Sequence, residues 1–125
     1  MTDAVQMKDL YHRQHAEWLG RFDFVQDQIK IFEKELALVV HQHADRMPLI
    51  EHVEEYRNIL ARKSHHVDEF RDQISLWERL ISPDAPEPET ANTQEHDLLE
   101  QGINQFLADF EDLKIALRRF VSRND

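Results

Sequence analysis

The feature that most constrains this chain is a regular pattern of apolar residues between positions 18 and 43. Residues spaced alternately four and three apart are nearly all apolar, which places their side chains on one side of an α-helix. We call such a line of residues a seam. Its members here are Trp18, Phe22, Val25, Ile29, Phe32, Leu36, Val39 and His43. The pattern predicts a long helix that packs lengthwise against other helices.

Two later stretches repeat this spacing. The second seam consists of Leu49, Val53, Tyr56, Leu60, Lys63, Val67, Phe70, Ile74, Trp77 and Ile81. The third consists of His96, Leu99, Ile103, Phe106, Phe110, Leu113, Leu117 and Phe120. Pro48 lies directly before the second seam, and proline is favoured in the first turn of a helix but disrupts a helix interior. We therefore predict an all-α fold, an antiparallel three-helix bundle of long, heptad-patterned helices.

The 125 residues are enough for one hydrophobic core, so we predict a single helical-bundle domain over residues 1–125. The expected elements are helices over about residues 4–44, 48–81 and 93–122, with an acidic, proline-rich linker over 82–92. Asn92 and Glu95 have the spacing of a capping box, which marks the start of a helix. Gly20 lies within the first pattern, and a break at this glycine, giving four helices, is the alternative.

Composition and charge exclude several classes of protein. The net charge of −10 opposes binding to nucleic acid or to an anionic membrane, because phosphates are bound by concentrated Lys and Arg. The absence of cysteine excludes disulfides, thiolate catalysis and Cys-ligated zinc. The first ten residues include Asp3, Lys8 and Asp9, unlike a signal peptide, and the longest apolar run, residues 36–40, is too short to span a bilayer. We expect a cytoplasmic protein.

A second apolar stripe accompanies the first seam. It repeats every seven residues, with Glu17 as an interruption, and we call it the α-stripe because it belongs to a single predicted helix. Its members are Leu10, Phe24, Ile31 and Leu38. At 100° per residue these side chains are expected almost on the back of the helix. We interpret the stripe as an interface for homo-oligomer formation, and the alternatives are cover by the third helix or tolerated surface exposure.

Histidine is abundant, with eight residues in the chain. His15 and His96 occupy seam positions and are expected at the same end of the bundle, close to His12 and to Glu78 of the second helix. Imidazoles beside a carboxylate can bind Zn²⁺, so a metal-binding bundle that uses His12, His15 and His96 is an alternative function. No Glu-x-x-His or His-Glu-x-x-His motif occurs, however, and we predict no metal and no cofactor.

Residues 82–97 contain five acidic side chains and no basic one. They are Asp84, Glu87, Glu89, Glu95 and Asp97. A solvated linker accounts for this charge, whereas an acidic regulator that docks a basic protein partner is a further alternative.

No catalytic motif is found, because Ser64, Ser75 and Ser82 have no evident base and the two glycines lie within helical patterns. The predicted function is a non-catalytic binding or structural module that self-associates through the α-stripe. Lys63 is the one charged member of the second seam. We expect it to pair with an acid, for which Glu33, Asp109 and Glu111 are the candidates.

Overall fold

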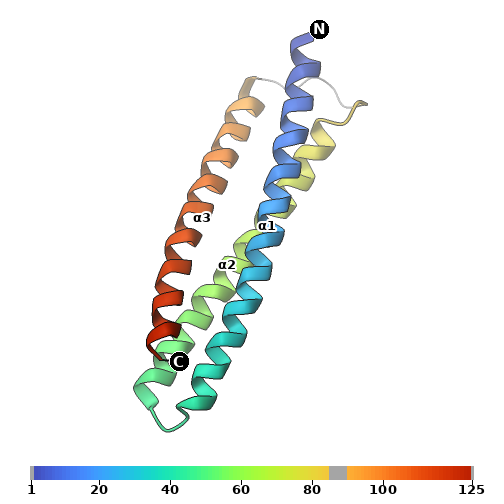
Figure 1. Cartoon of the computed structure of the whole chain (residues 1–125). Helices are drawn as coiled ribbons and strands as arrows, with labels where there is room; N and C mark the ends of the chain where they lie inside the picture. Colours follow the sequence, from blue (N-terminus) through green and yellow to red (C-terminus); the bar gives the residue numbers. More distant parts are fainter. Residues whose placement is uncertain (1, 85–89, 125) are drawn as a thin grey trace.

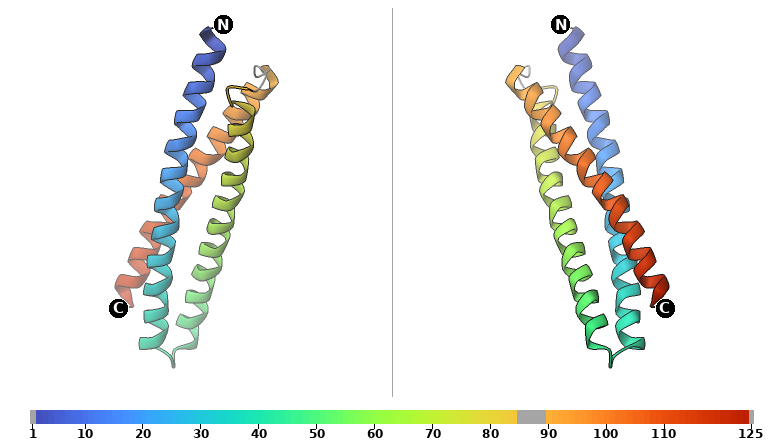
Figure 2. Two further views of the ribbon diagram at one scale, coloured as in Figure 1. Left: turned by 90° about the vertical axis from the view of Figure 1, so that its right-hand side faces the viewer. Right: turned by 90° about the vertical axis from the view of Figure 1, so that its left-hand side faces the viewer.

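The computed structural model describes residues 2–84 and 90–124 and shows an all-α three-helix bundle (Figure 1). The helices are α1 (Thr2–Gln42), α2 (Met47–Leu80) and α3 (Thr90–Arg123). In Figure 1, α1 runs downward from the N-terminus, α2 returns upward, and α3 runs downward again. The two side views in Figure 2 show that α3 crosses the other helices obliquely. Its beginning lies beside the end of α2, and its end lies beside the end of α1.

A tight turn joins α1 to α2. The backbone N–H of Arg46 donates to the carbonyl of His43 at 3.0 Å, and the carbonyl of Arg46 accepts from Leu49 and Ile50 at 3.1 Å. Pro48 lies in the first turn of α2, where a helix needs no N–H donor. Helix α1 ends at Gln42, whereas an end at about residue 44 was expected. Helix α2 begins at Met47, one residue before the expected start.

The beginning of α3 differs more from the sequence-based prediction. The helix starts at Thr90, so residues 90–92, which were assigned to the linker, are helical. Asn92 and Glu95 consequently lie inside α3 and not at its N-cap. Of the five acids in this region, Glu87 and Glu89 lie outside the described residues, whereas Asp84, Glu95 and Asp97 are exposed.

Gly20 does not interrupt α1, which is continuous from Thr2 to Gln42. The alternative of four helices is therefore wrong. A Cβ atom built at Gly20 would meet nothing within 4 Å, and Gly20 is exposed, so no packing contact requires a glycine there. The helical hydrogen bonds and the neighbouring seam maintain the helix through a residue with low intrinsic propensity.

The three seams meet in one core. Every α1 seam residue from Trp18 to Val39 is buried, and His43 is half-buried. Aromatic rings fill the middle of the bundle, where the ring of Phe22 stacks on that of Phe70 at 5.6 Å between centroids. Phe106 of α3 packs edge-on against both rings, at 6.0 and 5.5 Å. Burial of these large apolar side chains is the main source of stability for the fold.

Two lysines lie at the edge of this core. Lys63 is half-buried and its Nζ lies 5.4 Å from the centroid of Phe106. The expected acidic partner is not found, since no carboxylate in the described part of the chain lies within ion-pair distance of Lys63. Lys114 of α3 is buried. Its Nζ contacts Glu111 Oε1 at 2.9 Å and lies 5.4 Å from the centroid of Phe24.

No helix in residues 2–84 and 90–124 combines the length and the apolar character that crossing a membrane requires.

Candidate functional site

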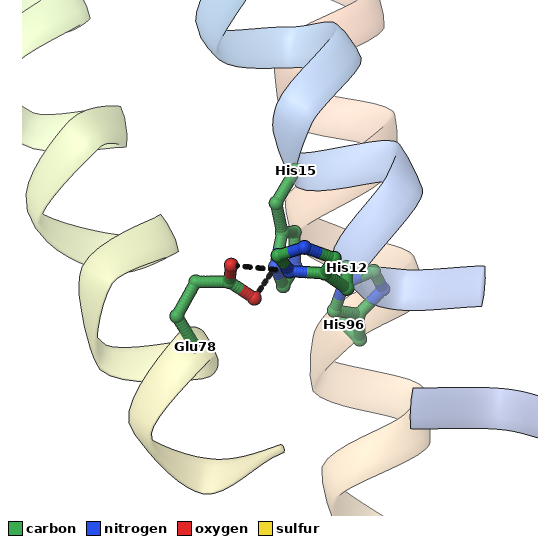
Figure 3. Close-up of polar contacts among 4 residues, drawn as sticks. All are labelled: His12, His15, Glu78 and His96. Atoms are coloured by element: carbon green, nitrogen blue, oxygen red, sulfur yellow. Dashed lines mark hydrogen bonds and ion pairs between the residues drawn. The ribbon is translucent and has the colours of Figure 1, made fainter. Parts of the chain in front are cut away.

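Polar side chains from all three helices meet at the end of the bundle where α3 begins. His12 and His15 come from α1, Glu78 from α2 and His96 from α3, and we call these four residues the histidine cluster (Figure 3). The prediction that His15 and His96 approach one another near Glu78 is confirmed. The seam spacing predicts this contact, because both histidines continue the lines of residues that face the core.

Three short contacts connect the histidine cluster. His15 Nδ1 lies 2.9 Å from Glu78 Oε2, and His12 Nδ1 lies 2.7 Å from Glu78 Oε1. His15 Nε2 lies 2.8 Å from His96 Nε2. The side chains of His15 and His96 are both 0% exposed, whereas that of His12 is 67% exposed. Glu78 therefore connects a buried imidazole pair to a histidine at the surface.

With both imidazoles neutral, the hydrogen bonds leave one arrangement of the protons. An ionised carboxylate only accepts, so the Nδ1–H of His15 donates to Glu78. A neutral imidazole has a single N–H, which leaves His15 Nε2 as an acceptor for the Nε2–H of His96. His96 Nδ1 then carries no proton. It is a buried nitrogen without a hydrogen-bond partner in the described structure.

Aromatic rings enclose His96. Tyr11 stacks on it with 3.5 Å between ring centroids, and Trp18 lies at 5.5 Å. Trp77 packs edge-on at 4.9 Å. Burial, and next the neighbouring His15, lower the pKa of His96 to about 4, while Asp97 acts in the opposite direction. His96 is therefore neutral at pH 7, in agreement with the hydrogen bonds.

The geometry does not favour the metal-binding alternative. Two nitrogen ligands of one tetrahedral Zn²⁺ lie about 3.3 Å apart, given Zn–N distances of about 2.0 Å. The Nε2 atoms of His15 and His96 lie 2.8 Å apart and share a proton. Within residues 2–84 and 90–124, no group of three or more His, Asp or Glu side chains is arranged to hold a metal ion. The contacts of the cluster connect side chains of all three helices.

The α-stripe is a second candidate site. Helix α3 leaves about half of each side chain exposed, so cover by the third helix does not account for the stripe. The exposed fractions are 51% for Leu10, 56% for Phe24, 49% for Ile31 and 53% for Leu38.

The stripe does not lie on the back of α1. Phe24 lines a surface groove together with Leu107 and Ala108 of α3, and Leu38 lines a second groove together with Val121. At Phe24 and Leu38 the stripe thus borders α3. The expectation was wrong because each stripe residue directly precedes a buried seam residue and therefore lies 100° from it around the helix, which is a flanking position.

A further apolar surface was missed by sequence reasoning. Leu76 and Leu80 of α2 and Leu98 of α3 are about half exposed or more, and all three line a groove between these helices. Each lies directly before a buried residue of its seam, as the members of the α-stripe do. An apolar residue in that position is the signal that would have found this surface.

No protein-family model matches the chain, and neither the curated proteins nor the solved structures compared with it gave a match.

Proposed function

We propose that this chain is a non-catalytic helical-bundle module that self-associates through the α-stripe. The observation that carries the proposal is the exposure of about half of Leu10, Phe24, Ile31 and Leu38 on one rigid helix. Burying the exposed half of such a side chain is worth about 1 kcal/mol. A two-fold dimer buries the set twice, so eight side chains contribute against the entropy lost on association.

The two-fold arrangement that fits this stripe places α1 against its own copy in antiparallel orientation, with Phe24 and Ile31 near the axis. The net charge of −10 opposes association in general. Near the stripe, however, the charges are mixed, so opposite charges can meet across the axis. They are Arg13, Arg21, Lys30, Lys34, Glu17, Asp27 and Glu35. We further propose a cytosolic location, because a chain without cysteine needs no oxidising compartment.

Sedimentation equilibrium tests the proposal. The wild type is expected to dimerise, whereas the double variant Phe24→Glu/Ile31→Glu is expected to remain monomeric, because four charges then meet at the axis. Both side chains are about half exposed, so the variant is expected to retain its helical circular dichroism. The matched control is Leu76→Glu/Leu98→Glu, which places the same charges on the groove between α2 and α3 and should still dimerise.

A wild type that stays monomeric at high concentration would contradict the proposal. So would a stripe variant that associates as strongly as the wild type. Loss of association in the control variant alone would assign the interface to the groove between α2 and α3.

A further inference from the structure

The hydrogen-bonded pair His15–His96 connects α1 to α3, and the bond from His15 to Glu78 adds α2 to the same chain of contacts (Figure 3). Both imidazoles are completely buried, and aromatic rings surround His96. A polar connection in such a site depends on the number of protons that it contains, because every N–H there must meet an acceptor.

The neutral pair contains two protons, one between His15 Nδ1 and Glu78 and one between the two Nε2 atoms. If both of these hydrogen bonds are kept, a third proton on the two rings must occupy His96 Nδ1. There it would form a buried N–H without an acceptor among the described residues, and the buried pair would carry a positive charge. Separation of the helices relieves both effects, because the new N–H and the charge then reach water.

We propose that the His15–His96 pair is an acid-operated latch, and that protonation at His96 Nδ1 releases the beginning of α3 from α1 and α2. The charged groups that face the pair act in opposite directions on the free energy of placing a positive charge there. Glu78 from α2 and Asp97 and Glu100 from α3 favour a positive charge. His12 from α1, when it is protonated, opposes that charge. Tyr11, the other titratable group of α1 at this site, stays neutral in acid, so it does not compensate a proton on His96.

Release is expected to remain local. Beyond the cluster the seam of α3 continues with Ile103, Phe106 and Phe110, which are buried among apolar side chains and do not titrate. The lowered pKa of His96, about 4, means that the latch is closed at neutral pH and opens in acid. The inference is independent of self-association, because none of the latch residues belongs to the α-stripe.

The two tryptophans of the chain, Trp18 and Trp77, both contact His96, so intrinsic fluorescence reports on the latch directly. Emission is recorded from pH 7.5 to pH 4, together with amide hydrogen exchange in α3. We expect a red shift of the emission as the pH falls. Exchange over residues 96–103 should accelerate about tenfold more than exchange over residues 113–120.

Two variants identify the proton acceptor. In His96→Gln the amide N–H can still donate to His15 Nε2 but the side chain does not titrate, so the red shift and the accelerated exchange should both disappear. The control is His52→Gln at the opposite end of the bundle, where His52 stacks on Tyr56 and lies beside Phe120. This variant should retain the wild-type transition.

The proposal is overturned if the wild-type emission and exchange do not change with pH, or if His96→Gln shows the wild-type transition. It is also overturned if exchange accelerates equally over residues 96–103 and 113–120, since the whole bundle then unfolds. That last comparison uses the wild type alone, so it decides even if His96→Gln fails to fold.

Discussion

Lys63 occupies a seam position where an apolar side chain is expected, and it contacts Phe106 instead of an acid. A cation beside an aromatic ring in a half-buried site contributes about 0.5–1 kcal/mol. An apolar side chain at the same position removes the need to desolvate an ammonium group and packs against the same ring. We expect Lys63→Leu to raise the free energy of unfolding by about 1 kcal/mol, measured as a higher urea midpoint with an unchanged slope.

The control for Lys63 is Lys30→Leu, because Lys30 is exposed on α1 and away from the seam. This substitution should change stability by less than about 0.5 kcal/mol. A midpoint that falls for Lys63→Leu would show that the lysine itself contributes more than an apolar replacement, through register or through a ligand.

Each glycine lies inside a long helix, and neither has a positive φ. A Cβ at Gly20 meets nothing within 4 Å, and a Cβ at Gly102 meets the ring of Phe70 at 3.8 Å, an ordinary contact. Alanine loses less backbone freedom on folding than glycine does. We expect Gly20→Ala and Gly102→Ala each to raise the free energy of unfolding by about 0.5–1 kcal/mol, measured by thermal and urea unfolding.

A proline at position 20 tests the continuity of α1 in the opposite direction, by destabilising the helix. Gly20→Pro removes a helical hydrogen bond and should lower the free energy of unfolding by about 3 kcal/mol or more. A loss of stability in Gly20→Ala, or tolerance of Gly20→Pro, would be evidence that α1 is interrupted at this position in solution.

For the whole molecule, stability is expected to depend on pH through His96. In the unfolded chain His96 takes up a proton near its ordinary pKa of 6.5, whereas in the folded bundle its pKa is about 4. Between these values the unfolded state binds more protons, so the free energy of unfolding falls as the pH falls through this window. The shift corresponds to about 3 kcal/mol at its limit, reached below pH 4.

Urea unfolding at intervals from pH 7.5 to pH 4.5 measures this dependence, since most carboxylates are still ionised in that range. The decline should be smaller in His96→Gln than in the wild type, because the glutamine does not titrate in either state. Equal declines in the two proteins would assign the acid sensitivity to other groups.

Spacing along the chain determined the three helices and the direction in which each seam faces. It also determined the meeting of His15 with His96, because the periodicity of a helix is local and does not depend on its neighbours. The same reasoning misplaced the beginning of α3, since helix ends depend on caps and packing that a periodic pattern does not encode.

Only the tertiary structure decided how the helices are rotated about their axes and shifted along one another. That arrangement places Phe24 beside α3 and not on the back of α1, and it gives Lys63 an aromatic ring in place of a carboxylate. It also leaves His96 Nδ1 without a hydrogen-bond partner among the residues that the structure describes. These contacts join residues 40 or more positions apart, and close packing of whole side chains selects among helix arrangements that share the same seams.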